Sequence, residues 1–513
     1  MRTNHLHRHR ATPVVHTLCL LLCLSLLITG GIHAEDTLSP EEHFEKACTF
    51  LKNTEGDPDT EHAIPHLLAA AEQDYVRAQR VLGGIYLNRF ENEGGAAEDG
   101  EKAFHWLERG AEGGDAKAQE MFGSLYEYGI AVEQDDFKAI QWYRKSAEQG
   151  YDQGQYYFAV MLYAGRGIPA DSIEAATWYK KAAIRGYSPA QALLGKLYSD
   201  GGGVSQNYEK AVMWYRKSAD QEDPAGLNHL GFMLGSGLGV PKDETEALRL
   251  YQQSADLDYA PAQYNLGACY ASGLGVEKDV AKALVLFQQA AAQEYPPAQY
   301  SLGTHYQKPD RGDIDLEKAI AWLEKAADQD YAPAQCELGL SYYHGKPVAH
   351  VDQDFNEAAK WFRKAADQGN AEAQCYLGYL YIRGEGREPD PAMGIQWIRE
   401  AANQGLAEAQ LALSTHYFEG MDVEKDIAEG LHWLKKAAAQ ETPGAQVQLA
   451  IQYVDGDAVE KDAIEGIKLL EAAVAQNDPE AQHWLAYYLH VGEIVPKDEE
   501  RAVLLDSKAA EQG

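Results

Sequence analysis

The sequence predicts an all-α protein, an α-solenoid of about twelve antiparallel helix-pair repeats that follow a degenerate N-terminal unit. Two observations predict this class. The stretch from Tyr187 to Glu222 recurs along the chain, at steps of 36 residues apart from one of 40 and one of 39. Each copy holds two runs with helical periodicity, and strand patterns are scarce. A fixed period of about 20–50 residues is typical of stacked repeats.

The copies align on one position, which is Gln191 in the stretch above. It is glutamine in eleven copies and leucine in one. The aligned residues are Gln79, Gln119, Gln155, Gln191, Leu227, Gln263, Gln299, Gln335, Gln374, Gln410, Gln446 and Gln482.

The N-terminal segment, residues 1–34, has the pattern of a secretory signal peptide. Basic residues such as Arg2 precede an apolar run from about Val14 to Ile28, and small residues follow up to Ala34. This order predicts export with cleavage after Ala34. The alternative is an uncleaved anchor, but the run is shorter than the roughly 20 apolar residues that span a bilayer. We expect an exported chain, periplasmic rather than secreted, without a membrane span once the segment is removed.

Residues 35–77 predict a degenerate capping repeat. Ser39 to Leu51 can form a first helix, and Ala63 to Ala71 resembles the second helix of the later copies, with leucine at its large position. An atypical unit is expected at the end of a stack, because one of its faces meets water. Residues 78–513 then form the regular repeat domain.

Each regular copy begins with a helix, from Ala190 to about Asp200 in the stretch above. Leu194, Leu197 and Tyr198 recur at the spacing of one helical face. The residue after Leu194 is glycine in eight copies, alanine in three and serine in one. Glycine inside a helix costs roughly 1 kcal/mol relative to alanine. Its recurrence therefore predicts that a neighbouring helix approaches closely there.

A glycine ends the first helix in ten of the twelve copies, Gly201 in this one. Glycine adopts the left-handed conformation of a helix C-cap without steric cost. Runs such as Gly235 to Gly239 resemble phosphate-binding loops, but no strand precedes them, which argues against a nucleotide site.

The second helix begins after Asn207, a position that holds Asp or Asn in every copy. Such a side chain accepts a hydrogen bond from an otherwise unpaired backbone N–H at a helix start. We therefore predict N-caps rather than metal ligands at this position: Asp99, Asp135, Asp171, Asn207, Asp243, Asp279, Asp315, Asp354, Asp390, Asp426, Asp462 and Asp498.

Seven residues after the predicted N-cap lies a large side chain, tryptophan in eight copies and leucine in four. We interpret it as core packing between layers, with a ligand-stacking stripe as the alternative. The tryptophans are Trp106, Trp142, Trp178, Trp214, Trp322, Trp361, Trp397 and Trp433.

The combined pattern, AQxxLGxxY, then GxG-V, then D/N-xx-KA-xx-WY-x-KAA, closely resembles the Sel-1-like repeat, a relative of the tetratricopeptide repeat. The resemblance covers about residues 78–513. It implies a right-handed solenoid and, since most members of the family are adaptors that assemble other proteins, a role in protein binding. A cysteine-rich branch has members linked to β-lactamase-like activity and joins the helices of each repeat by a cysteine pair. This chain lacks that pattern.

The formal net charge is −34, and it becomes −37 if the three arginines of the signal segment are removed. Nucleic-acid binding relies on clustered Lys and Arg, so nucleic acid is excluded as the main partner. A strongly acidic chain attracts basic partners. Solubility alone is the other explanation.

Cys336 and Cys375 occupy equivalent positions in adjacent repeats. Equivalent points on stacked helices lie about 8–10 Å apart, whereas a disulfide needs Cα atoms within about 7 Å. A bridge between them is conceivable but not favoured. No residue is assigned to a catalytic, cofactor or metal site.

If the first helices line an inner face, their outward positions follow the aligned glutamine by one, five, eight and nine residues. Aromatic and Arg side chains, which often dominate interface energetics, occupy many of these positions, and about half of the tyrosines are expected to pack between repeats. The predicted partner-binding residues are Tyr128, Tyr156, Tyr163, Phe232, Tyr264, Tyr300, Tyr343, His344, Tyr379, Arg383, Phe418 and Tyr487.

The sequence thus favours a non-catalytic scaffold or adaptor of the bacterial cell envelope that binds protein or peptide partners and needs no cofactor. One alternative is a cell-wall or β-lactam hydrolase of the cysteine-rich branch, but Ser and His are scattered without a nucleophile–base arrangement. Another is a secreted factor that engages a host. The partner and the oligomeric state are not encoded in any pattern we recognise.

Overall fold

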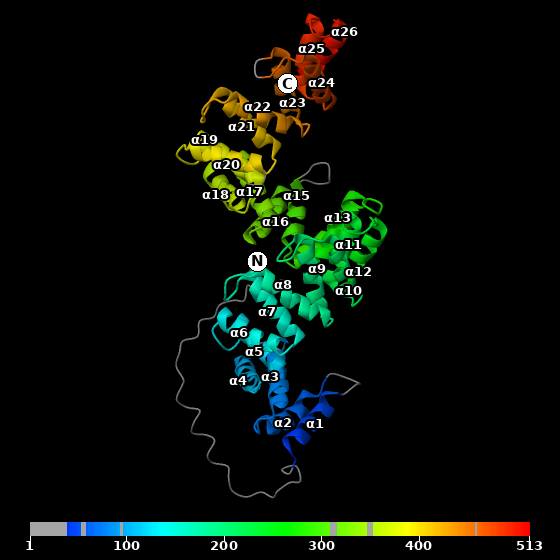
Figure 1. Ribbon diagram of the computed structural model, residues 1–513, viewed down its shortest axis with the longest axis vertical. Coiled ribbons are helices and arrows are strands. Elements are labelled where there is room, and N and C mark those ends of the chain that lie inside the picture. Colours follow the sequence, from blue (N-terminus) through cyan, green and yellow to red (C-terminus); the bar gives the residue numbers. More distant parts are fainter. Residues whose placement is uncertain are drawn as a thin grey trace. The chain divides into compact units, whose positions relative to one another are not determined.

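The computed structural model describes residues 38–52, 58–92, 96–307, 315–345, 352–456 and 459–512. In these ranges the chain forms helices α1 to α26 and no β-strand (Figure 1). It divides into two compact units, an N-terminal unit that ends at Leu286 and a C-terminal unit that begins at Phe287. The predicted signal peptide lies outside the described residues, as does its cleavage site at Ala34.

Antiparallel helix pairs follow one another along the N-terminal unit, and each odd-numbered helix is the first of its pair. The pairs are α1 (Pro40–Leu51) and α2 (Thr60–Ala71), α3 (Val76–Asn92) and α4 (Ala97–Glu112), α5 (Ala116–Tyr128) and α6 (Asp136–Glu148), α7 (Asp152–Ala164) and α8 (Ser172–Ile184), α9 (Ser188–Asp200) and α10 (Tyr208–Ala219), and α11 (Pro224–Ser236) and α12 (Glu244–Asp256). Helices α13 (Ala260–Ser272) and α14 (Val280–Ala292) follow, and the boundary between the two units falls within α14.

The C-terminal unit continues the same order. Its pairs are α15 (Pro296–Gln307) and α16 (Leu316–Asp328), α17 (Ala332–His344) and α18 (Phe355–Asp367), α19 (Ala371–Arg383) and α20 (Pro391–Asn403), α21 (Ala407–Glu419) and α22 (Ile427–Ala438), α23 (Pro443–Asp455) and α24 (Ala463–Ala475), and α25 (Pro479–Val491) and α26 (Glu499–Glu511). The all-helical repeat fold predicted from the sequence is confirmed.

The predicted N-caps start the second helices at eleven of the twelve positions. In α10, for example, Asn207 Oδ1 accepts a hydrogen bond of 2.8 Å from the backbone N–H of Lys210. The prediction for Asp99 was wrong. The first regular copy carries extra residues, and they extend α3 to Asn92 and start α4 at Ala97, so that Ala96 is the N-cap and Asp99 lies inside the helix.

The recurrent glycine of the first helix lies against the second helix of its own pair. A Cβ atom added at Gly195 would lie 2.7 Å from the Tyr215 ring, and one at Gly339 would lie 2.5 Å from the Phe362 ring. Real Cβ atoms do not come so close to ring carbons. The predicted close approach of a neighbouring helix is therefore confirmed, and it accounts for glycine at this position.

The aligned glutamines connect successive pairs through a buried polar ladder. Gln191 Nε2 donates to the carbonyl of Ala183 at 3.0 Å, while its Oε1 accepts a hydrogen bond of 2.8 Å from Gln221 Nε2. The same glutamine–glutamine contact joins Gln149 to Gln119 at 2.7 Å. Because buried amides need partners, the glutamines that make both bonds help to fix the register between one pair and the next.

The tryptophans of the second helices fulfil the core prediction only in part. Trp106, Trp214 and Trp433 are buried, and the other five are half-buried. A lysine three residues later covers the outer ring face in most copies: Lys181 Nζ lies 3.3 Å from the ring centroid of Trp178. These rings therefore pack inward and carry a cation on the outside.

Candidate functional site

Several neighbouring first helices contact one another within each unit, and we call the surface that the first helices present the first-helix face. Neighbouring first helices contact each other directly, α5 with α7 and α9 with α11 in the N-terminal unit, and α23 with α25 in the C-terminal unit. In the part of the chain that the structure describes, successive second helices make no comparable contact. Where these contacts occur, the first helices therefore lie on the inner side of the local bend.

The twelve predicted residues all lie on first helices, but the structure divides them into two classes. Half are exposed, with Tyr128 at 57%, Phe232 at 49% and Tyr487 at 51% of their full accessible surface. The exposed residues are Tyr128, Tyr163, Phe232, His344, Arg383 and Tyr487; the half-buried ones are Tyr156, Tyr264, Tyr300, Tyr343, Tyr379 and Phe418.

The half-buried residues have structural contacts as well. Phe418 packs against Gly430, where an added Cβ would lie 3.0 Å from the ring. Tyr300 contacts Tyr331 with ring centroids 5.7 Å apart. For these residues, substitution by alanine removes core contacts, so they are poor probes of binding.

In the C-terminal unit the structure brings three predicted residues together. Arg383 of α19 donates a hydrogen bond of 3.0 Å to the hydroxyl of Tyr343 on α17. Its guanidinium also lies 5.5 Å from the ring centroid of Tyr379. Tyr376, which the sequence did not single out, stacks on Phe362 and contacts Tyr343. The result is a small aromatic surface that spans two repeats and carries one cation.

In the N-terminal unit a larger tyrosine cluster lies between α5, α7 and the start of α9. Tyr156 contacts Tyr157 and Tyr187 with ring centroids 5.1 Å and 5.3 Å apart. Tyr157 in turn stacks on Tyr143 of α6. Burial raises the pKa of Tyr156 to about 12, so its hydroxyl stays protonated at neutral pH. Only Tyr156 of this cluster was predicted, because the others lie outside the four chosen positions.

A buried ion-pair network borders this cluster. Glu127 is held by Arg166 at 2.5 Å and by the hydroxyl of Tyr143 at 2.6 Å. Arg166 also pairs with Asp136 at 2.6 Å. Hydrogen bonding to Asp136, and then to Glu127, raises the pKa of the guanidinium above its ordinary value. The network fixes the loop after α7 against α5 and α6.

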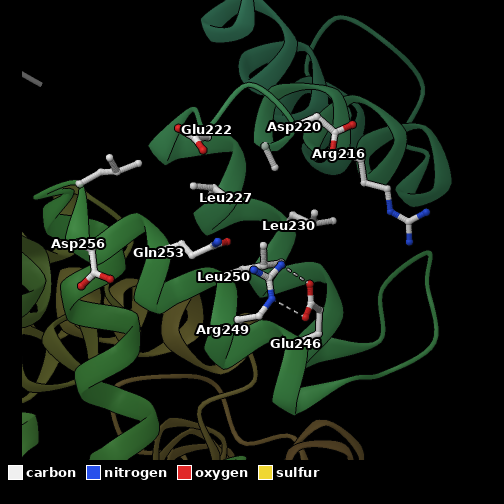
Figure 2. A pocket seen from close by; sticks show the side chains of 12 residues that line it. Arg216, Asp220, Glu222, Leu227, Leu230, Glu246, Arg249, Leu250, Gln253 and Asp256 are labelled. Carbon is white, nitrogen blue, oxygen red and sulfur yellow. Dashed lines mark hydrogen bonds and ion pairs between the residues drawn. The ribbon is translucent and has the colours of Figure 1, made fainter.

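A second surface feature is a pocket of about 620 Å³, lined by residues of α10, α11 and α12 and of the turns that follow α10 and α12. Figure 2 shows the side chains that line it. Here the glutamine ladder is interrupted, because Leu227 and Leu257 replace the two glutamines of the pair. Leu250 also stands where most copies have tryptophan. Leu227, Leu230 and Leu250 form the apolar centre, and Arg249 at its edge pairs with Glu246 at 2.6 Å.

The described cysteines do not form disulfides. Cys48, Cys269, Cys336 and Cys375 are all free thiols. Burial raises the pKa of Cys375 to about 12 and that of Cys336 further still.

Within the described ranges, no group of three His, Cys, Asp or Glu side chains could hold a metal ion. None of the helices described is both long and apolar enough to cross a membrane.

The repeat pattern decides the family. The Sel1 repeat model matches twelve segments: residues 76–115, 116–151, 152–187, 188–223, 224–259, 260–295, 296–331, 332–370, 371–406, 407–441, 443–478 and 479–513. The chain belongs to the Sel1 repeat family. Stacked repeats of this kind create extended surfaces, and the first-helix face is such a surface.

Solved Sel1 repeat structures resemble the chain. One is a protective antigen that displays an SLR fold and is present in uropathogenic Escherichia coli strains. Its sequence is 31% identical to this chain, and its structure matches with a TM-score of 0.51. The match covers 87% of this chain and 94% of the antigen. A Sel1 repeat protein from Oxalobacter formigenes is 30% identical with a TM-score of 0.43, over 48% of this chain and 96% of that one. A comparison with curated proteins finds no match.

Proposed function

We propose that this Sel1 repeat protein is a non-catalytic scaffold of the bacterial cell envelope that binds protein or peptide partners on its first-helix face. The observation that carries this proposal is the set of large exposed side chains on first helices of three repeats in the same unit: Tyr128 on α5, Tyr163 on α7 and Phe232 on α11. Aromatic residues contribute large contact areas and are enriched among residues that dominate binding energy.

The absence of catalysis is part of this proposal, and it is supported by the structural roles of the chemically capable residues. The recurrent Asp side chains cap helices, as Asp243 does for the N–H of Glu246. Buried serines bond to backbone, as Ser254 does to the carbonyl of Pro224. The recurrent Asp and the buried Ser side chains therefore have structural roles, in capping helices or in bonding to the backbone.

Location in the cell envelope is supported by the signal-peptide pattern of residues 1–34 and by the acidic charge. A net charge of −34 attracts basic partners to the chain and repels nucleic acid. The partner we expect is therefore an exported protein or peptide with a basic or aromatic segment.

Affinity capture with matched variants tests the proposal. The chain purified after export is immobilised, exposed to an envelope extract, and the captured proteins are identified. The binding variant combines Tyr128→Ala, Tyr163→Ala and Phe232→Ala. The control combines Phe137→Ala, Ile173→Ala and Met213→Ala, which remove exposed apolar side chains from second helices of the same unit.

We expect the control to retain its partner and the binding variant to lose it, with both variants keeping the helical circular-dichroism signal of the parent. Capture that survives in the binding variant, or is lost equally in both, contradicts the proposed face. A partner present only in periplasmic fractions supports the envelope location.

A second candidate is a secreted factor that engages a host. One observation favours it: the structural relative of 31% identity is a protective antigen of uropathogenic Escherichia coli strains. Fractionation separates the two candidates, because a scaffold of the envelope stays with the periplasm whereas a secreted factor accumulates in the medium.

A further inference from the structure

The pocket lined by α10, α11 and α12 departs from the repeat pattern at three apolar positions. Leu227 stands where the other copies have the aligned glutamine, and Leu257 where most have the glutamine that donates to it. Leu250 stands where eight copies have tryptophan. All three residues line the pocket, whose volume is about 620 Å³. This volume falls within the range of about 300–1,000 Å³ that is typical of ligand sites.

Helices α18, α19 and α20 show the same arrangement with the tryptophan present. Trp397 of α20 occupies the position of Leu250. It packs on a core cluster that contains Leu377, the counterpart of Leu230. The guanidinium of Arg363, on α18, lies 5.3 Å from the centroid of the Trp397 ring. The indole of one second helix is therefore covered by an arginine of the preceding second helix.

Helices α10, α11 and α12 keep the neighbours of that indole but not the indole itself. Arg216 of α10 occupies the position of Arg363. It lines the pocket together with Leu230 and Leu250. Because leucine is smaller than tryptophan, the space that the Trp397 ring takes in its own copy is available to a ligand in this one.

Charged side chains surround the apolar centre of the pocket, as Figure 2 shows. Among them, Arg249 pairs with Glu246 at 2.6 Å. The other charged lining residues are Arg216, Asp220, Glu222 and Asp256. Three of these four are carboxylates, so the rim carries an excess of negative charge. Charge complementarity therefore favours an occupant with a basic neighbour.

We propose that this pocket binds a tryptophan side chain of a partner protein, with a lysine or arginine next to it in the partner's sequence. The indole packs on Leu230 and Leu250, and Arg216 covers its face. The basic neighbour meets Asp220 and Glu222 at the rim. The chain's own repeats show the same pairing, because a lysine or arginine follows seven of the eight recurrent tryptophans by three residues.

The pocket is lined mainly by α10, α12 and the turns that follow them. The inference therefore goes beyond the proposed binding of partners on the first-helix face.

The probe is an acetylated and amidated Gly-Trp-Lys-Gly peptide that carries 5-fluorotryptophan, because a fluorine signal reports on the peptide alone. The same peptide with glutamate in place of lysine is the charge control. Binding to the purified chain is measured by fluorine NMR titration at neutral pH.

The first test variant is Leu250→Trp. It gives this copy the indole that other copies carry and so fills the pocket from within. Leu286→Trp makes the same change at the equivalent position of α14 and serves as the control. Circular dichroism checks that both variants are folded.

A second pair of variants changes only exposed side chains and leaves the core intact. Asp220→Asn combined with Glu222→Gln removes two carboxylates from the rim. Glu148→Gln combined with Glu209→Gln removes two exposed carboxylates from second helices of the same unit and serves as the control.

We expect the parent and Leu286→Trp to bind the lysine peptide about three- to tenfold more tightly than the glutamate peptide, and Leu250→Trp to bind neither. The rim variant should lose the preference for lysine, and its control should keep it. Absence of binding to the parent, binding that survives in Leu250→Trp, or equal binding of the two peptides to the parent overturns the site.

The pocket and the first-helix face are tested separately. The variant with Tyr128→Ala, Tyr163→Ala and Phe232→Ala should bind the lysine peptide as the parent does. Loss of peptide binding in that variant would assign the peptide to the first-helix face and overturn the pocket. Failure of the pocket leaves the scaffold proposal standing, since capture of an envelope partner measures that proposal.

Discussion

The side-chain nitrogen of Gln221 donates a hydrogen bond of 2.8 Å to the side-chain oxygen of Gln191, thirty residues earlier. This contact joins the end of one helix pair to the first helix of the same repeat, and Gln191 in turn bonds to Ala183 of the preceding pair. The repeat surface that carries the exposed aromatics depends on this ladder, because it sets how each pair lies on the last.

Gln191→Leu should destabilise the chain by about 1–3 kcal/mol, because the Gln221 amide and the Ala183 carbonyl then lose a buried partner. Adding Gln221→Leu should cost less than the sum of the two single changes, since it recreates the leucine pair that Leu227 and Leu257 form in the next repeat. Urea unfolding of the two single variants and the double variant measures this coupling. Strict additivity would contradict the ladder.

Arg185→Gln should stabilise the protein. Arg185 stands where other repeats have the donor glutamine, and the buried Gln155 Oε1 finds no hydrogen-bond partner. A glutamine at 185 supplies the missing donor, which is worth about 0.5–1.5 kcal/mol. Lys180→Gln, which removes an exposed charge from α8, serves as the control for the change in charge. A midpoint of thermal unfolding that does not rise would argue against the assignment.

Gly195→Ala and Gly235→Ala should have opposite effects. A Cβ at Gly195 would lie 2.7 Å from the Tyr215 ring, whereas one at Gly235 meets the Ala247 Cβ at an ordinary 3.5 Å. The first change should destabilise by about 1–3 kcal/mol through overpacking. The second should be neutral or stabilise by up to about 1 kcal/mol through helix propensity. Denaturant unfolding distinguishes them, and a similar effect at both sites would contradict the packing argument.

Glu120→Gln should change the pH dependence of stability. The pKa of Glu120 is about 7 in the folded chain and about 4.3 in an unfolded one. The fold therefore favours the protonated form, and the contribution of Glu120 to stability is greatest below pH 4 and is lost as the pH rises from about 4.5 to 7.

At pH 8, where Glu120 is ionised, the glutamine variant should be more stable than the parent by up to about 3 kcal/mol. At pH 4 the two should be nearly equal. Chemical unfolding of both proteins at several pH values gives this difference directly, and a difference that does not grow between pH 4.5 and 7 would show that Glu120 is not buried in its neutral form.

Much of the fold was readable from the sequence because each repeat carries the same local signals. Asp243 caps a helix start and Gly195 leaves room for a ring, and both can be recognised from their recurrence. The prediction for Asp99 was wrong since the extra residues of that copy changed where the helices begin and end, which no local pattern records. Glu120 was missed for a related reason: nothing in its own segment shows that its side chain is buried.

The proposed binding surface was only partly predictable. The spacing rule identified residues on the first-helix face, but it did not separate Tyr128, which is exposed, from Tyr300, which packs on Tyr331. Exposure depends on the size of the side chains in the adjacent repeat. The disposition of such neighbours can be inferred only when the stacking of the helix pairs is known.

The most direct test of the central claim is side-chain oxidation of the chain with and without its captured partner. Our account predicts that Tyr128, Tyr163 and Phe232, on first helices, become protected when the partner binds, while Phe137, Ile173 and Met213, on second helices, react as in the free chain. Protection of the second-helix residues with no change on the first helices would contradict it.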